Sequence, residues 1–174
     1  MSSPLTCDEE HMVRALTLAE GVRGTTAPNP WVGCVVVARD GDGAAETFEG
    51  ATEPPGGAHA EVVALSRARA RGRSAGSTLY TTLEPCSHTG RTPPCVDAVV
   101  DAGVARVVVG VLDPDPHVAG TGVAALRAAG VEVSVGVAAD RVGEQLAPYL
   151  KHRRTGRPWV VLKLASTLDG RIAA

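Results

Sequence analysis

The sequence predicts an α/β protein built around one domain of ordinary size. Valine-rich runs of strand length, such as residues 31–38 and 106–111, are interleaved with stretches of helical periodicity that end at glycine. Aromatic residues make up only 3% of the 174 residues, so the core must consist of Val, Leu and Ala. This composition suits a β-branched sheet covered by alanine-rich helices, with room for one small extra segment.

Local signals place the elements in order along the chain. Thr6 and Glu9 form a capping-box sequence, which marks the start of the first helix. Helices are expected at residues 7–22, 59–72, 93–103, 119–129 and 140–150. Strands are expected at residues 31–38, 46–50, 77–82, 106–111, 131–135 and 158–164, with a turn at 40–43 that closes a hairpin. The hairpin, together with parallel pairs between the later strands, predicts a mixed sheet of about five strands.

Charge and composition exclude several classes of function. A formal net charge of -2 gives no electrostatic reason to expect nucleic acid or an anionic membrane as a partner. No run approaches the roughly 18 apolar residues of a membrane span, and the first residues lack the features of a signal peptide. We therefore expect a cytoplasmic protein with reduced thiols. Its cysteines, at positions 7, 34, 86 and 95, are better explained as metal ligands or core residues than as disulfides.

Four residues carry the chemistry that the sequence predicts: His59, Glu61, Cys86 and Cys95. One imidazole and two thiolates are the protein ligands of a catalytic zinc site that keeps one position open, and Zn²⁺ in such a site makes water a nucleophile near neutral pH. Glu61 would stay off the metal and move protons, as in hydrolytic deaminases. Residues two apart do not share a helix face, so His59 and Glu61 can converge only at the first turn of their helix.

The eight residues between the two cysteines differ from the two that short deaminase signatures have. This loop contains His88 and Arg91, a combination that suits a sugar phosphate, although a surface loop with an unrelated arginine is the simpler alternative. His88 could instead be the fourth ligand of a structural zinc site. Asn29 stands between two prolines, and it either forms an Asx turn or presents its amide to a polar ring.

Longer motifs resemble a known family. They are Pro28-Asn29-Pro30, His59-Ala60-Glu61, the run from Thr82 to Cys95, and Asp113-Pro114-Asp115-Pro116. Together they closely resemble the deaminase domain of bifunctional riboflavin-biosynthesis deaminase/reductases. The resemblance implies a cytidine-deaminase-like fold, a three-layer α/β/α sandwich. It also implies hydrolytic deamination of 2,5-diamino-6-(5-phosphoribosylamino)pyrimidin-4-one to the corresponding uracil derivative.

The same resemblance assigns a role to individual residues. It implies zinc ligands at His59, Cys86 and Cys95, a proton shuttle at Glu61, and substrate contacts at Asn29, His88 and Arg91. One position departs from the family, because Thr52 stands where many members have a histidine. The resemblance therefore implies a ribose or phosphate contact that is arranged differently here.

The resemblance also divides the chain. Residues 1–150 form the expected deaminase domain, 151–157 a basic linker, and 158–174 the truncated start of a reductase-like domain. We therefore expect no reductase activity and no NADPH binding, a separate reductase, and a homodimer that pairs through the edge strand at 158–164.

Two other functions compete with this interpretation. One is a zinc deaminase of another base or nucleotide, of the cytidine, tRNA adenosine or secondary-metabolite type, and the other is a non-catalytic zinc-binding module. The long spacing between the cysteines argues against the first, and an intact Glu61 against the second.

Overall fold

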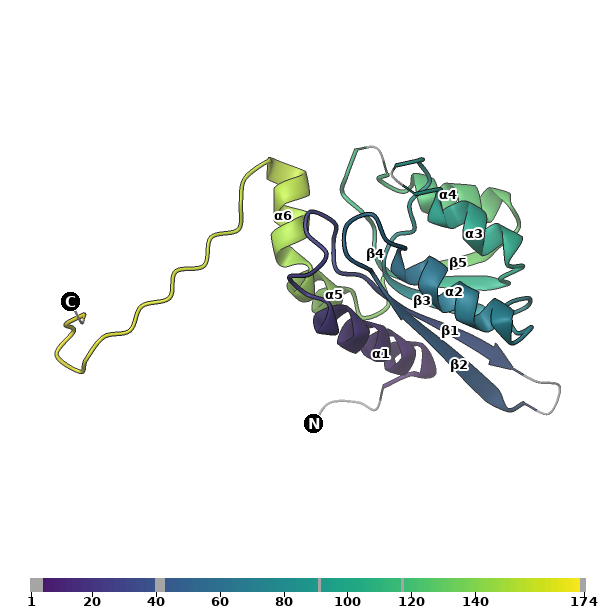
Figure 1. Ribbon diagram of the computed structural model, residues 1–174, viewed down its shortest axis with the longest axis horizontal. Coiled ribbons are helices and arrows are strands. Elements are labelled where there is room, and N and C mark those ends of the chain that lie inside the picture. Colours follow the sequence, from purple (N-terminus) through teal and green to yellow (C-terminus); the bar gives the residue numbers. More distant parts are fainter. Residues whose placement is uncertain (1–4, 40–42, 91, 117, 173–174) are drawn as a thin grey trace.

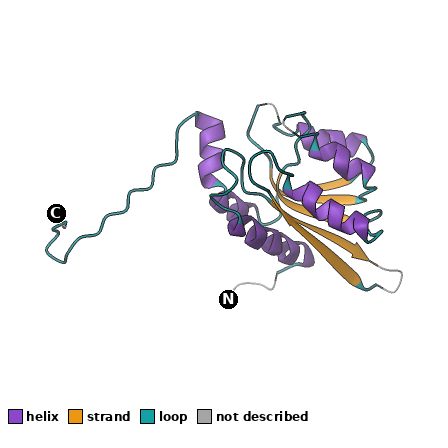
Figure 2. Ribbon diagram, viewed as in Figure 1, coloured by secondary structure: helices purple, strands orange, loops and turns teal. Residues whose placement is uncertain are grey.

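The computed structural model describes residues 5–39, 43–90, 92–116 and 118–172, and its centre is a five-stranded sheet (Figure 2). The strands are β1 (Gly33–Arg39), β2 (Ala45–Ala51), β3 (Thr78–Leu83), β4 (Arg106–Val111) and β5 (Glu132–Val135). Their order in the sheet is β2-β1-β3-β4-β5. Strand β1 pairs antiparallel with β2 and β3, whereas β3, β4 and β5 run parallel. The predicted mixed sheet of five strands is confirmed.

Helices cover both faces of this sheet (Figure 1). One face carries α1 (Cys7–Gly21) and α5 (Ala139–Gln145), which contact each other as well as the strands. The other face carries α2 (Ala60–Ala70), α3 (Cys95–Asp101) and α4 (Thr121–Ala128), which contact one another in series. The three-layer α/β/α sandwich that the resemblance implies is therefore present.

Valine side chains of β1 and β4, the strands on either side of the central β3, form the middle of the core. Val35 and Val36 of β1 and Val107 and Val108 of β4 are at most 1% exposed. Each fully buried valine contributes about 1.5–3 kcal/mol relative to an exposed one. Gly33 lets α1 pack closely on β1, because a Cβ at this position would lie 1.9 Å from the carbonyl oxygen of Ala15.

The predicted capping box opens the first helix. The backbone N–H of Glu9 donates to Thr6 Oγ1 at 3.3 Å, and the backbone N–H of Thr6 donates to Glu9 Oε2 at 2.7 Å. These two bonds satisfy donors that the first turn of a helix otherwise leaves without partners. Most other element bounds differ from the expected ones by one or two residues, while the predicted turn at 40–43 falls largely outside the described residues.

The expected helix at 140–150 is two helices, α5 and α6 (Ala147–Thr155). Pro148 has no N–H to continue the first helix, so a new helix begins around it. Residues 151–155, expected as part of a linker, are helical instead. Arginine and lysine are good helix formers, and cations in the last turn favour the helix dipole. Gly156, with φ +68°, closes α6.

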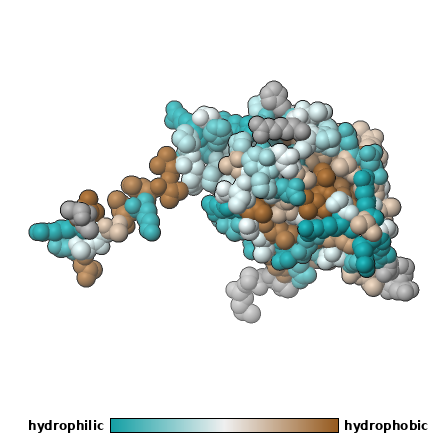
Figure 3. All heavy atoms as spheres, in the orientation of Figure 1, coloured by the Kyte–Doolittle hydropathy of each residue, from teal (hydrophilic) through white to brown (hydrophobic). Residues whose placement is uncertain are grey.

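The strand expected at 158–164 does not form within the described residues. This segment runs extended and unpaired away from the body, as Figures 1 and 3 show, and Val160 and Leu162 are each 78% exposed. A valine-rich pattern favours extended backbone, but a strand also needs a neighbouring strand to pair with. The proposed division of the chain at residue 150 stays a prediction. No helix in the described part of the chain is long and apolar enough to cross a membrane.

Candidate metal centre and active site

The start of α2 brings His59 and Glu61 to one place. His59 is the N-cap of α2, with extended dihedrals of φ -75° and ψ 159°, and Glu61 lies in the first helical turn. The prediction that the two side chains converge at a helix start is confirmed. Gly50 of β2 makes room for this start, because a Cβ there would lie 2.3 Å from the carbonyl oxygen of Ala60.

The start of α3 brings the two cysteines together. Cys95 is the first residue of α3, while Cys86 lies in the loop that follows β3. The backbone N–H of Cys95 donates to Cys86 Sγ at 3.3 Å. An N–H at the positive end of a helix stabilises a thiolate, which is the form that binds metal.

Three donor atoms lie in positions that fit zinc. Cys95 Sγ and Cys86 Sγ lie 3.2 and 3.7 Å from His59 Nδ1. All three donor atoms lie within 4.8 Å of one another. Tetrahedral zinc, with Zn–S near 2.3 Å and Zn–N near 2.1 Å, would separate an imidazole nitrogen from a thiolate sulfur by about 3.6 Å. The set His59, Cys86 and Cys95 therefore fits Zn²⁺ with one position left open.

The two thiols differ in how readily they ionise. Hydrogen bonding from Cys95, with further help from His59, lowers the pKa of the Cys86 thiol to about 4. The hydrogen bond with Cys86, together with burial, raises the pKa of the Cys95 thiol. The hydrogen bond with Cys86 also raises the pKa of His59. These opposite pKa shifts arise because the three donor atoms are close enough to share protons. A bound cation would favour the deprotonated form of each donor, since it binds through their lone pairs.

Glu61 lies beside the three donors but is not one of them. The residue is 4% exposed, and its Oε2 accepts a hydrogen bond from Cys95 Sγ at 3.6 Å. Burial raises the pKa of this carboxyl group. A raised pKa makes the carboxylate a stronger base, which suits a group that must accept a proton and then donate it.

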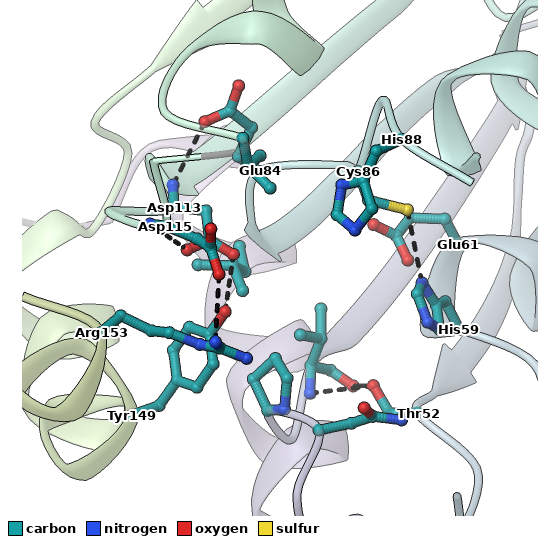
Figure 4. A pocket seen from close by; sticks show the side chains of 15 residues that line it. Thr52, His59, Glu61, Glu84, Cys86, His88, Asp113, Asp115, Tyr149 and Arg153 are labelled. Atoms are coloured by element: carbon teal, nitrogen blue, oxygen red, sulfur yellow. Dashed lines mark hydrogen bonds and ion pairs between the residues drawn. The ribbon is translucent and has the colours of Figure 1, made fainter. Parts of the chain in front are cut away.

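A cavity opens in front of this centre (Figure 4). Asn29 and His88, to which the resemblance assigns substrate contacts, both line it, whereas Arg91 lies outside the described residues. The backbone carbonyl of Asn29 accepts a hydrogen bond from Thr26 Oγ1 at 3.0 Å, which fixes the turn that carries it. Thr52 also lines the cavity, and its Oγ1 accepts a hydrogen bond from the backbone N–H of Val32 at 3.1 Å.

The far wall of the cavity contains residues that the sequence did not single out for roles at the site. They are Glu84, Asp113, Asp115, Tyr149 and Arg153. Buried Glu84 accepts hydrogen bonds from the backbone N–H groups of Asp113, Gly120 and Val123 at 3.0–3.2 Å, so it holds the loop after β4. The available signals were the places of Glu84 in the motif before Cys86 and of Asp113 and Asp115 in the motif Asp113-Pro114-Asp115-Pro116. Tyr149 and Arg153 come from α6, and only the fold brings that helix to the cavity.

Comparison with known proteins agrees with this geometry. The family described as the cytidine and deoxycytidylate deaminase zinc-binding region matches residues 5–111. The riboflavin biosynthesis protein RibD of Escherichia coli (strain K12) is 50% identical over 166 residues, which is 95% of this chain and 44% of that protein.

Two solved structures are similar in both sequence and fold. RibD of Acinetobacter baumannii is 47% identical with a TM-score of 0.84, covering 94% of this chain and 44% of that one. A diaminohydroxyphosphoribosylaminopyrimidine deaminase/5-amino-6-(5-phosphoribosylamino)uracil reductase of Thermotoga maritima is 42% identical with a TM-score of 0.84, covering 95% of this chain and 46% of that one. The chain thus spans a little under half the length of these relatives. It belongs to the zinc-binding cytidine and deoxycytidylate deaminase family, as a deaminase domain of the RibD type.

Proposed function

We propose that the chain deaminates 2,5-diamino-6-(5-phosphoribosylamino)pyrimidin-4-one by hydrolysis, giving 5-amino-6-(5-phosphoribosylamino)uracil and ammonia. The observation that carries the proposal is buried Glu61 beside an open His/Cys/Cys donor set, at the base of a cavity. The Thermotoga maritima relative, which is 42% identical, is a deaminase of a diaminohydroxyphosphoribosylaminopyrimidine, the same substrate class. In the reaction, the oxygen of water becomes bonded to the ring carbon and the bond from that carbon to the exocyclic nitrogen breaks.

The chain's own residues handle the protons of this reaction. Zinc held by His59, Cys86 and Cys95 would supply Lewis-acid chemistry that makes water a nucleophile near neutral pH. Glu61 takes one proton from water and gives it to a ring nitrogen, and it then takes the second proton from the new hydroxyl group and gives it to the departing amine. Its burial keeps bulk water from competing for that proton, and its raised pKa suits both the accepting and the donating step.

Two residues at the cavity wall orient the ring. Asn29 offers an amide with both a donor and an acceptor, which matches the alternating donors and acceptors of a diaminopyrimidinone edge. His88 lies in the loop between the cysteine ligands and also lines the cavity. We assign Arg91 to a substrate contact as well because it shares this loop. We place the reaction in the cytoplasm, in a homodimer.

The test is ammonia release by the zinc-loaded chain. We expect turnover of the diaminopyrimidine ribotide, and much slower turnover of cytidine and deoxycytidylate. Preference for either of these two would overturn the proposed substrate while keeping the chemistry. Glu61→Gln should lower kcat about 10²- to 10⁴-fold, the usual contribution of a positioned general acid and base. Glu10→Gln on the exposed side of α1 is the matched control and should keep its activity.

Metal binding provides a second, independent readout. We expect close to one zinc per chain, with Cys86 and Cys95 protected from thiol reagents until a chelator removes the metal. Cys7 is exposed and should react in both states, so it serves as the internal control. Equal reactivity of Cys7 and Cys86 in the zinc-loaded chain would contradict the assigned ligands.

A further inference from the structure

The short helix α6 contributes to the wall of the cavity. Tyr149 and Arg153, one turn apart on this helix, both line it, and the guanidinium Cζ of Arg153 lies 5.3 Å from the centre of the Tyr149 ring. Figure 4 shows these two side chains across the cavity from His59, Glu61 and Cys86. Helix α6 lies beyond residues 5–111, the part of the chain that the family description matches.

The charges that line the cavity are unevenly distributed. Glu61, Glu84, Asp113 and Asp115 supply four carboxyl groups. Arg153 is the one lysine or arginine among the described residues of the lining. Two negative charges on a substrate phosphate would therefore be repelled from most of the described wall and attracted only to the region of Arg153.

Arg153 is held in place before any ligand arrives. Its Nη1 lies 3.1 Å from Asp115 Oδ2, and the side chain is 39% exposed against 15% for that of Asp115. The Tyr149 ring supports the guanidinium from one side, while Tyr149 Oη donates to Asp113 Oδ2 at 2.8 Å. A guanidinium has five N–H donors in a planar fork, so one carboxylate partner leaves donors for a second anion.

We propose that Arg153 is a specificity residue that binds the phosphate of the substrate and so selects the ribotide over its dephosphorylated riboside. This inference rests on the proposed function, since it places the reacting ring at Glu61 and the phosphate at the far end of the ribose. The half-exposed guanidinium stands where a group that extends across the cavity from the metal centre would end. Helix α6 thereby becomes part of the active site rather than a linker.

The first experiment compares two substrates in three proteins. Zinc-loaded wild type, Arg153→Gln and Arg154→Ala are assayed with the ribotide and with the riboside. Arg154 is the matched control because it is the exposed neighbour of Arg153 and does not line the cavity. In Arg153→Gln we expect the preference for the ribotide, as a ratio of kcat/KM values, to fall about 10- to 100-fold, mostly through KM. Arg154→Ala should keep the wild-type preference.

A merely structural role for Arg153 predicts a different result. Loss of the contacts with Asp115 and Tyr149 would lower kcat/KM for both compounds by the same factor and leave the preference unchanged, which would overturn the proposal. Arg153→Lys separates charge from fork geometry, and we expect it to recover part of the preference. Thermal unfolding of each variant shows whether the fold is retained, and the preference ratio remains meaningful for a partly destabilised protein.

A binding measurement separates this inference from the proposed function. Ribose 5-phosphate and ribose are titrated calorimetrically into wild type and Arg153→Gln. Binding of the phosphorylated sugar alone, lost in the variant, supports the phosphate site even if the wild type deaminates neither pyrimidine. If the wild type deaminates the ribotide but the variant keeps both its preference and its affinity for ribose 5-phosphate, the proposed function stands and this inference fails.

Discussion

Two tyrosine–aspartate pairs lie at opposite ends of the parallel strands and behave in opposite ways. At the amino end of β4, Tyr80 Oη donates to Asp8 Oδ1 at 2.9 Å. At the carboxyl end, Tyr149 Oη donates to Asp113 Oδ2 at 2.8 Å. The hydrogen bond from Arg106 lowers the pKa of Asp8, whereas burial raises the pKa of Asp113.

The position of the cation accounts for the difference. Arg106 binds Asp8 through two nitrogens, at 3.0 and 2.8 Å, so the charged form of that carboxyl group is fully paired. Arg153 forms its ion pair with Asp115 instead, and Asp113 is left 6% exposed with a neutral phenol as its side-chain partner. At the amino end of β4 the carboxylate of Asp8 is thus paired with the guanidinium of Arg106, and the pair stabilises the fold. The other end keeps a buried carboxyl group with a raised pKa beside a cavity, an arrangement typical of a functional site.

The largest effect on stability is expected for Glu84→Gln at the cavity end. The buried carboxylate accepts three backbone N–H groups, and a glutamine must turn its own NH₂ toward at least one of them. We expect the free energy of unfolding in denaturant to fall by about 3 kcal/mol. Because the loop that carries Asp113 forms the cavity wall, activity should fall as well. Exposed Glu144→Gln is the control, and an unchanged stability in Glu84→Gln would contradict this role.

Arg106→Gln tests the opposite end and should affect stability alone. Removing the guanidinium leaves Asp8 half-buried without its cation, which we expect to cost about 2 kcal/mol of unfolding free energy. The cost is smaller than for Glu84 because the Asp8 side chain is 28% exposed and water replaces part of the lost hydrogen bonding. We expect kcat to stay within about twofold of wild type. A tenfold loss of kcat without a loss of stability would break the contrast between the two ends.

The metal centre was predictable because its signals are local. The order of His59, Glu61, Cys86 and Cys95, together with helix-start signals at both segments, determines where the side chains converge, and the structure brings them together as expected. The predicted fold class was equally local in origin, since the alternating valine-rich and helical runs correspond to real strands and helices.

The part of the far wall that α6 contributes was not predictable because it depends on tertiary packing. The run that contains Arg153 is polar all round, and such a run looks like a solvated linker unless the docking of its helix is known. The segment at 158–164 shows the converse error. Its apolar pattern is typical of a strand, yet no described strand pairs with it, and strand formation depends on a partner that local sequence does not specify.

Matched tyrosine variants sharpen the comparison further. Tyr80→Phe and Tyr149→Phe each remove one hydroxyl that donates to a carboxylate, and each should cost about 1 kcal/mol of unfolding free energy. Only Tyr149→Phe should raise KM for the ribotide, because Tyr149 lines the cavity and lies against the Arg153 guanidinium. A rise in KM of similar size in Tyr80→Phe would mean that the two ends are coupled through β3 and β4.

The smallest effect is a difference in pH dependence between Asp8→Asn and Asp113→Asn. The pKa of Asp8 is lower in the folded state than in the unfolded state, where it is about 3.9. Asp8 therefore contributes its full stabilisation above about pH 3.9, and this contribution is lost as pH falls through the folded-state pKa. The pKa of Asp113 is higher in the folded state, so the reverse holds. Its contribution is full below the unfolded-state pKa and is lost as pH rises through the folded-state pKa.

Denaturant unfolding of wild type and both variants from about pH 3 to 7 measures the two contributions by subtraction. We expect the free energy lost on mutating Asp8 to shrink toward low pH, and the free energy lost on mutating Asp113 to shrink toward neutral pH. If both losses of free energy changed with pH in the same direction, the hydrogen bond from a tyrosine, which is common to both pairs, would decide the pKa shift of the aspartate. The position of the arginine would then not decide it.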